Sequence, residues 1–157
     1  MPEEDISRYG AYLQGVRHAS QNTVSSYLRD VTQFSQYLAE RGHTLRQADS
    51  GMVRDYMDWM HRHGKSAASV TRFLASIKSF YGFLLTAGDV EVNPAKGISA
   101  DRAERKYPEI LTAKEVELFL DQPQCVDAKG YRDHAMLELL YATGIRVSEL
   151  ISLDLRD

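Results

Sequence analysis

Arg146 and Glu149, close to the end of the sequence, are the residues whose types and spacing best suit chemistry on a phosphate group. Gly144 precedes them, and glycine readily adopts the positive φ that often ends a helix. We therefore expect Arg146 in the first turn of a new helix, where free backbone N–H groups and the helix dipole favour an anion. A guanidinium there can bind two phosphate oxygens, and Glu149 can orient it. The alternative interpretation is a structural ion pair that closes a helical hairpin.

The elements that must position this pair are predicted to be helical. Ahead of Gly144, apolar residues recur at the i, i+3, i+4 and i+7 positions of one helix face: Met136, Leu139, Leu140 and Thr143. This spacing predicts a buried amphipathic helix over 131–143. Thr112 and Glu115 have the spacing of a capping box, which predicts an earlier helix that runs to about Asp121.

Further helices are predicted upstream from apolar periodicity, polar N-cap residues and terminal glycines. They are a helix over 4–17 with Ile6, Tyr9, Leu13 and Val16 inward, one from Ser20 to Arg41-Gly42, one capped by Asp49 or Ser50 that ends before Gly64, and one from Ser66 to Gly88. No segment shows the alternation of a strand, so the predicted fold class is all-α. Asn93-Pro94 breaks the helical pattern. We expect a helical bundle over 3–92, a linker over 93–107 and a second domain over 108–157.

Composition excludes several classes of protein. No apolar run approaches the length of a membrane span, and the acidic start of the chain, Met1 to Asp5, does not resemble a signal peptide. The single cysteine, Cys125, cannot form an intrachain disulfide, so we expect a reducing, cytoplasmic location. No cluster of cysteine and histidine has the spacing of a metal site, and we expect neither a metal nor a membrane partner.

The net charge of −3 argues against nucleic-acid binding, but the charges are unevenly distributed. No acidic residue occurs between Asp5 and Asp30, or between Asp58 and Asp89. Several basic residues fall in these two windows: Arg8, Arg17, Arg29, Arg62, Lys65, Arg72 and Lys78. Local charge of this kind sets the affinity for phosphates, so the windows predict one basic surface and an acidic back. Chance clustering on a solvated face is the alternative.

Two predicted helices carry short polar residues on their outward faces, where solvated helices usually carry glutamate and lysine. On the helix from Ser66, helical geometry places Arg72 and Ser79 nearly opposite the apolar stripe. Hydroxyl and amide groups with interspersed arginine suit a helix that lies against DNA. From both helices and their ends, the candidate DNA contacts are Thr23, Ser26, Arg29, Gln33, Lys65, Arg72, Ser76, Lys78 and Ser79.

The string from Tyr131 to Leu153, with Ala-Thr-Gly-Ile-Arg-Val-Ser-Glu-Leu over 142–150, resembles the first catalytic box of the tyrosine recombinases, the Xer and phage-integrase family. Less specific similarities run from Ser20 to Leu38, from Ser66 to Tyr81 and from Asn93 to Val116. The resemblance implies a SAM-like core-binding helical bundle over 3–92. It also implies that the first helices of a truncated catalytic domain follow from about residue 108.

In that family a tyrosine attacks a scissile DNA phosphate to form a 3′-phosphotyrosine, without a metal or other cofactor. The resemblance implies that Arg146 is the first catalytic arginine and Glu149 its supporting acid. The family's later catalytic residues are absent from the 157 residues, so we expect a DNA-binding fragment that is inactive alone. The expected partners are double-stranded DNA, other recombinase protomers on DNA, and a second copy of the fragment through exposed catalytic-domain helices. The alternatives are a naturally truncated, non-enzymatic DNA-binding protein and an all-α protein-interaction domain.

A suicide DNA substrate incubated with the chain should trap no covalent adduct on a denaturing gel. None of the nine tyrosines follows the histidine- and arginine-bearing boxes that precede the nucleophile in the family, and one arginine cannot replace a missing nucleophile. An adduct that maps to any of these tyrosines would overturn this expectation.

Overall fold

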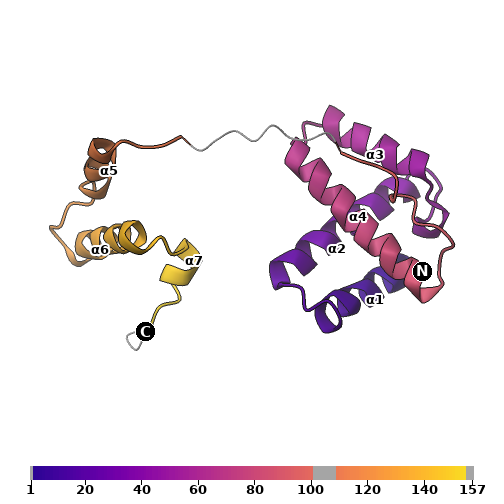
Figure 1. Cartoon of the computed structure of the whole chain (residues 1–157), viewed down its shortest axis with the longest axis horizontal. Coiled ribbons are helices and arrows are strands. Elements are labelled where there is room, and N and C mark those ends of the chain that lie inside the picture. Colours follow the sequence, from indigo (N-terminus) through magenta and orange to yellow (C-terminus); the bar gives the residue numbers. More distant parts are fainter. Residues whose placement is uncertain (1, 101–108, 155–157) are drawn as a thin grey trace. The chain divides into compact units, whose positions relative to one another are not determined.

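The computed structural model describes residues 2–100 and 109–154. Contacts within the chain define two units, Met1–Arg105 and Lys106–Asp157, which we describe separately. Every regular element in the described ranges is helical, which confirms the all-α prediction (Figure 1).

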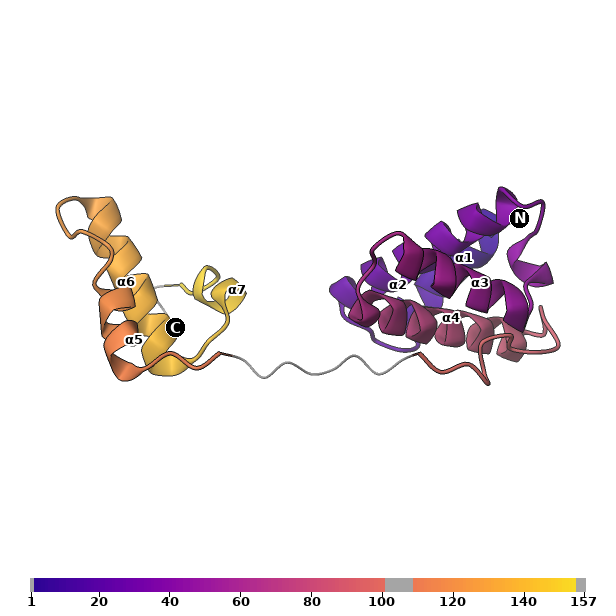
Figure 2. The same cartoon turned by 90° about the horizontal axis from the view of Figure 1, so that it is seen from above.

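The first unit is a bundle in which α2 and α4 each contact the three other α-helices. Its elements are α1 (Pro2–Gly15), α2 (Gln21–Ala39), the 3₁₀ turn η1 (Leu45–Gln47), α3 (Ser50–Arg62) and α4 (Ala67–Ala87). α4 packs against α1, α2 and α3, and it crosses α2 in the view of Figure 1. Figure 2 shows the same bundle from above, with α4 along one side of the other helices.

Polar side chains begin the bundle helices at the predicted positions. Ser20 Oγ accepts a hydrogen bond from the Thr23 N–H, and Ser66 Oγ accepts one from the Ser69 N–H. Of the two candidate caps for α3, Asp49 is the one that accepts, from the Met52 N–H at 2.9 Å. These bonds satisfy backbone donors that have no partner within the helix. The local sequence therefore predicts where these helices start.

The core of the bundle combines aliphatic side chains with seven aromatic ones. The largest fully buried side chains include Tyr9, Phe34, Phe73, Phe80 and Tyr81, drawn from α1, α2 and α4. The Tyr81 hydroxyl donates to the Leu45 carbonyl at 2.7 Å, so this polar atom is satisfied inside the core. Val16 was expected to join the first apolar stripe, but α1 ends at Gly15 and Val16 is exposed. That expectation was wrong because the chain leaves the helix before the stripe is complete.

Residues 93–100 pack against the bundle, although the sequence predicted a linker from residue 93. Ala95 and Ile98 are buried in the same core as the helices. The Asn93 side-chain amide donates to the Lys78 carbonyl at 3.0 Å, and Lys78 Nζ donates to the Ile98 carbonyl. These hydrogen bonds hold residues 93–98 against α4. The polar, aperiodic sequence of this segment could not predict this packing. The remainder of the expected linker, 101–107, lies outside the described residues.

An ion-pair cluster, Asp5, Arg46 and Asp89, joins three distant parts of the bundle. Arg46 donates through Nε and Nη2 to both carboxylate oxygens of Asp5, at 2.9 and 2.7 Å. The same guanidinium lies 3.1 Å from an Asp89 oxygen. Asp5 is buried, so its carboxylate depends on this partner. The Arg46 guanidinium holds the pKa of Asp5 below its ordinary value.

The second unit contains α5 (Ala113–Leu120), α6 (Ala128–Thr143) and α7 (Val147–Leu150). α5 begins with the predicted capping box: the Glu115 N–H donates to Thr112 Oγ1, and the Thr112 N–H donates to Glu115 Oε2. α6 packs against both α5 and α7. It needs Gly130 in its first turn, because a Cβ there would overlap the Gln124 carbonyl.

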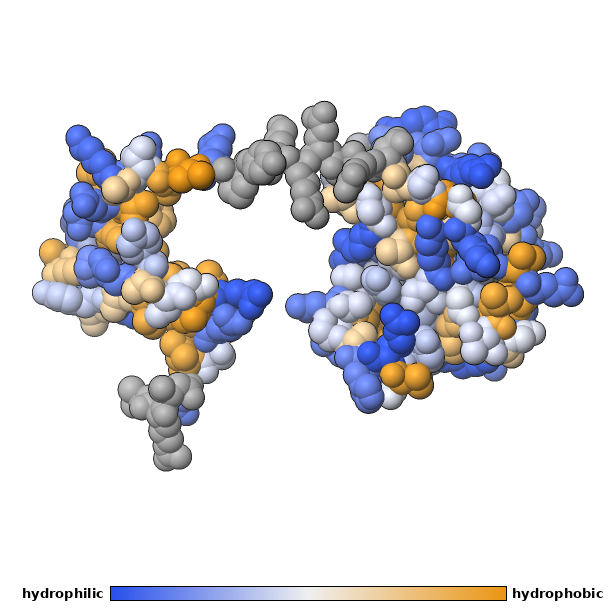
Figure 3. All heavy atoms as spheres, in the orientation of Figure 1, coloured by the Kyte–Doolittle hydropathy of each residue, from blue (hydrophilic) through white to orange (hydrophobic). Residues whose placement is uncertain are grey.

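Apolar side chains are exposed on this second unit, as the orange areas of Figure 3 illustrate. Among the described residues, Leu120 and Leu150 are the only buried ones in this unit. The buried helix predicted over 131–143 is therefore not observed: α6 forms, but Leu139 and Tyr141 are exposed and Met136 is half-buried. The apolar stripe correctly predicted the helix, but burial also requires a partner that covers it.

Replacing Ile98 with alanine should lower the free energy of unfolding of the bundle by about 2–3 kcal/mol, because a buried side chain is truncated. Val92→Ala, directly before residues 93–100, is the matched control. Val92 is exposed, so its replacement should change the free energy of unfolding by no more than about 0.5 kcal/mol. Denaturant unfolding followed by tryptophan fluorescence reports on the bundle, since Trp59 is the single tryptophan. Equal effects of the two variants would show that residues 93–100 are not part of the core.

The Asp5–Arg46 pair should make the bundle sensitive to acid. Because the pKa of Asp5 is lowered in the folded state, the pair contributes stability above the unfolded value of 3.8, and this stability is lost as the pH falls through the folded value. Arg46→Gln should lower the melting temperature at neutral pH, and the difference from wild type should shrink in strong acid.

Arg62→Gln is the control for this titration, because Arg62 is exposed and its Nε donates to the backbone carbonyl of Asp58 rather than to a carboxylate. Melting temperature measured across the acidic range distinguishes the two variants. A constant difference between wild type and Arg46→Gln at every pH would contradict the ionic origin of the effect.

Candidate functional site

A buried carboxylate, that of Asp30, lies between α2 and α4. Asp30 accepts hydrogen bonds from Arg72 Nε at 3.0 Å, Arg72 Nη2 at 2.8 Å and Ser76 Oγ at 2.7 Å. The Asp30 side chain is 2% exposed, whereas that of Arg72 is 41% exposed. The carboxylate therefore holds the inner edge of a guanidinium whose outer part reaches solvent.

The outer part of the Arg72 guanidinium retains donor capacity. Its Nη1 makes no hydrogen bond to any described residue, while Nε and Nη2 are both directed at Asp30. An arginine that is fixed on one edge and free on the other can present planar N–H groups to an acceptor outside the protein. The carboxylate raises the pKa of Arg72 further above its ordinary value, so the group stays charged.

The surface of α2 and α4 around this pair exposes no acidic side chain. The one acid within Gln21–Ala39 is Asp30, which is buried, and Ala67–Ala87 contains none. Apart from Leu85, the exposed positions of the two helices carry hydroxyl, amide, small or basic groups. Repulsion between protein carboxylates and an approaching anion is therefore minimal on this face.

Five of the predicted DNA contacts are accessible on α2 or next to α4. Arg29, Gln33 and Lys65 are exposed, and Thr23 and Ser26 are half-buried. Gln33 and Lys65 line one hollow of about 250 Å³ between α2, α3 and the start of α4. The structure thus brings together residues that lie 32 positions apart in the sequence.

Ser76 and Lys78 have other positions than the sequence predicted. Ser76 was expected on the outer face, but it is fully buried and donates to Asp30. The sequence prediction placed Ser76 on the surface because it oriented α4 by its apolar residues alone. The buried face of α4 is wider than this apolar stripe and includes Ser76. Lys78 Nζ donates to the Ile98 carbonyl, so its ammonium fastens residues 93–100. Ser79 is half-buried on the same helix.

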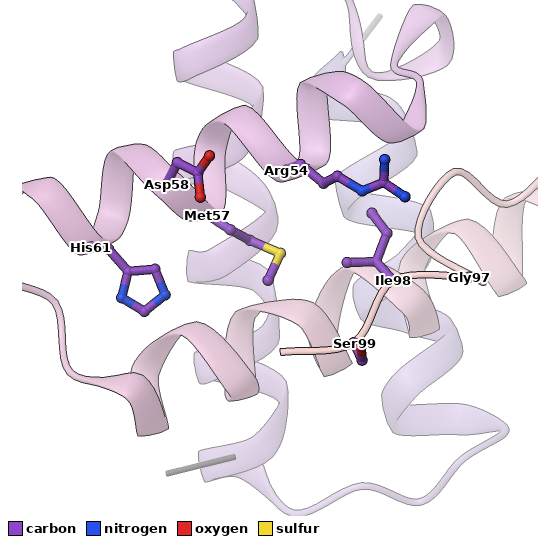
Figure 4. Close-up of a pocket in the computed structure, with 7 residues that line it drawn as sticks. All are labelled: Arg54, Met57, Asp58, His61, Gly97, Ile98 and Ser99. Carbon is purple, nitrogen blue, oxygen red and sulfur yellow. The ribbon is translucent and has the colours of Figure 1, made fainter. Parts of the chain in front are cut away.

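A hollow on another side of the bundle, beside α3, has mixed charge. It measures about 310 Å³ and lies between α3 and residues 97–99. Figure 4 shows Met57 and Ile98 directed toward one another there, with Arg54, Asp58 and His61 along the helix. The carboxylate of Asp58 lines this hollow, as that of Glu40 lines the hollow of Gln33 and Lys65. What distinguishes the α2–α4 face is that neither Gln21–Ala39 nor Ala67–Ala87 exposes a carboxylate of its own.

Arg146 and Glu149 are in contact, as the spacing suggested. Arg146 Nη1 donates to Glu149 Oε1 at 2.9 Å, and the Arg146 backbone N–H donates to Glu149 Oε2 at 2.8 Å. Gly144 has a φ of 67°, the left-handed value expected for it. Arg146 is the N-cap of α7 rather than a residue of its first turn, and its side chain is 81% exposed. A role in catalysis remains a prediction.

Among the described residues, no group of His, Cys, Asp and Glu side chains could hold a metal ion. No helix in the same part of the chain has the length and apolar character to cross a membrane.

Sequence reasoning missed Asp30, although a signal was available. An acid adjacent to Val31 and within the apolar stripe of α2 must be buried with a partner.

Comparisons with known proteins match both units. Residues 6–88 match the profile "Phage integrase, N-terminal SAM-like domain", and residues 109–157 match the profile "Phage integrase family". A Caldanaerobacter subterraneus subsp. tengcongensis protein, provisionally named a tyrosine recombinase, is 38% identical over 100% of this chain and 54% of its own length.

Two Xer proteins show similar identity. Tyrosine recombinase XerD of Staphylococcus saprophyticus subsp. saprophyticus is 35% identical over 97% of this chain and 52% of its own length. Tyrosine recombinase XerC of Vibrio parahaemolyticus serotype O3:K6 is 36% identical over 99% of this chain and 50% of its own length. The chain thus spans about half the length of the curated relatives that it matches.

Proposed function

Since the chain belongs to the phage integrase family of tyrosine recombinases, we propose that it supplies the duplex-binding, N-terminal part of a site-specific recombinase. The protein to which this part belongs would cut and rejoin DNA through a 3′-phosphotyrosine, using a nucleophile and further catalytic groups outside these 157 residues. The expected partners are double-stranded DNA and other recombinase protomers bound to it.

The observation that carries the DNA-binding proposal is the acid-free surface of α2 and α4. In a chain with a net charge of −3, it is an uneven distribution of charge that Arg29, Lys65 and Arg72 are accessible on or beside two helices that expose no carboxylate of their own. Glu40, directly after α2, is the acid at the edge of this face. Basic groups on such a face release the counterions of DNA phosphates, and short hydroxyl and amide side chains allow close approach. Thr23, Ser26, Gln33 and Ser79 are the polar contacts proposed on the same face.

Arg146 is proposed to stabilise charge on the scissile phosphate, with Glu149 as the group that orients it. The guanidinium is highly exposed, and one of its nitrogens is already bonded to the Glu149 carboxylate. An oriented donor of this kind lowers the energy of a phosphoryl transition state if it is fixed before the reaction. In this interpretation α6, Gly144 and α7 form the frame that presents Arg146.

The second unit is proposed to associate with another polypeptide surface, including a second copy of the chain. Apart from Val16, Leu85 and Val92, every exposed large apolar residue of the described chain lies in this unit. Contiguous apolar surface of this kind usually marks an interface. Size-exclusion chromatography with light scattering at increasing concentration tests self-association, and a strictly monomeric chain would oppose it.

Duplex binding should be weak and should fall steeply as salt is added, because the proposed face makes few phosphate contacts. In fluorescence anisotropy with a labelled mixed-sequence duplex at low salt, Arg29→Ala or Lys65→Ala should each reduce the slope of log affinity against log salt by about 1. Each replacement removes one phosphate contact.

Arg54→Ala is the matched control, since Arg54 is exposed on α3 beside the mixed-charge hollow. It should leave the slope unchanged. Equal effects of Arg54→Ala and Arg29→Ala would place binding elsewhere than on α2 and α4, and binding that does not respond to salt would contradict the electrostatic basis of the proposal.

A further inference from the structure

We propose that Asp30 is a positioning residue that presents Arg72 as a fixed reader of guanine in the DNA major groove. The inference rests on the proposed function, because it assumes that the α2–α4 face meets a duplex. It adds a specific role for a buried acid, and a base preference for one arginine.

The geometry of the pair supports a fixed rather than a mobile arginine. Both carboxylate oxygens of Asp30 are used, one by Arg72 Nε and one by Nη2, which sets the plane of the guanidinium. Ser76 Oγ lies 2.7 Å from Asp30 Oδ2 and 3.0 Å from the Arg72 carbonyl, and its single hydrogen serves both acceptors, with the carboxylate the nearer. The carboxylate is thereby itself held in place. An arginine ordered before binding loses less conformational entropy when it binds than a free surface arginine does.

The free edge of the guanidinium matches the acceptors of guanine. Nη1 and the second hydrogen of Nη2 have no acceptor among the described residues, and the Arg72 side chain is 41% exposed. In the major groove guanine presents O6 and N7, two neighbouring acceptors that bind an arginine in a bidentate manner. No other base pair presents two acceptors on a single base in that groove.

The charge of the pair favours a base edge over a phosphate. Arg72 and Asp30 together are neutral, and a phosphate that bound Nη1 would also feel the nearby carboxylate. A base edge carries only partial charges and binds through directed hydrogen bonds. The Asp30 carboxylate aligns the guanidinium for such bonds and repels a base edge less than it would repel a phosphate. Arg29 and Lys65, which form no ion pair with a described residue, are better suited to phosphates.

The surface around Arg72 allows a close approach. Ala68, Thr71 and Ala75 are exposed neighbours of Arg72 on α4, and all three are small. Because Asp30 holds the guanidinium back against the bundle, the arginine can reach a base only if the helix itself enters the groove. Small residues on the flanks of the arginine permit this.

The experiment is selection of bound sequences from a pool of randomised duplexes, carried out with the whole chain. Wild type, Arg72→Lys and Asp30→Asn are compared, with Arg54→Lys on α3 as the matched control. Wild type should enrich a guanine at a defined position, and Arg54→Lys should enrich the same guanine. Arg72→Lys keeps the charge but not the planar fork, and Asp30→Asn keeps the size but not the charged acceptor. Each should reduce the preference for that guanine about tenfold.

Affinity for the unselected pool distinguishes positioning from a loss of structure. It should change less than twofold in Arg72→Lys, with the same slope against salt as wild type. Asp30→Asn leaves the charge of Arg72 uncompensated, so its affinity for the pool should not fall below that of wild type, and its slope should increase by at most about 1. If Asp30→Asn unfolds the bundle in thermal denaturation, Arg72→Lys alone decides, since it leaves the carboxylate with a cationic partner.

The possible results separate the two proposals. If Arg72→Lys and Asp30→Asn enrich the same guanine as strongly as wild type, the proposed role of Asp30 and Arg72 is overturned while duplex binding stands. A wild-type chain that binds the pool without enriching any sequence would also overturn it. If wild type binds no duplex at low salt, the proposed function itself fails.

Discussion

The carboxylate of Asp30 is the group around which α2 and α4 are arranged. A carboxylate at this depth is costly unless cationic and hydroxyl donors surround it, and here Arg72 and Ser76 supply them. Arg72 and Ser76 lie 42 and 46 positions after Asp30 along the chain, so their hydrogen bonds to its carboxylate hold α4 against α2. The same bonds orient Arg72, so one contact between α2 and α4 also sets the geometry of a partly exposed side chain.

The placement of acids explains how a chain with a net negative charge can expose a basic face. Four aspartates border the two acid-free windows of the sequence, and three of them, Asp5, Asp30 and Asp89, are in ion pairs with arginines. Asp5 and Asp30 are also buried, whereas the fourth, Asp58, is exposed on α3. The charges of the paired aspartates are therefore compensated within the bundle, where they stabilise contacts between its elements. The helices α2 and α4 retain arginine and lysine without an exposed carboxylate of their own.

The second unit shows what local sequence can achieve without a surrounding core. Its helices begin at side-chain caps, α6 ends at a glycine with positive φ, and Arg146 already contacts Glu149. These interactions span three or four residues and need no distant partner. Its apolar side chains, in contrast, remain exposed. The frame for Arg146 is therefore formed locally, whereas burial of the apolar side chains requires a covering surface.

The sequence by itself determined the helices, their caps at Ser20, Ser66 and Thr112, and the contact between Arg146 and Glu149, because each depends on residues within one helical turn. It also carried the resemblance that the family profiles confirm.

Only the tertiary structure decided which polar residues face outward. Ser76 and Asp30 lie inside, and residues from Asn93 to Ile98 pack on the bundle instead of leaving it. Helical periodicity gives the angle of a side chain around its own axis, but the width of the buried face depends on how many neighbours pack against it. Those neighbours come from segments far away in the sequence, and their positions are fixed only when the whole bundle folds.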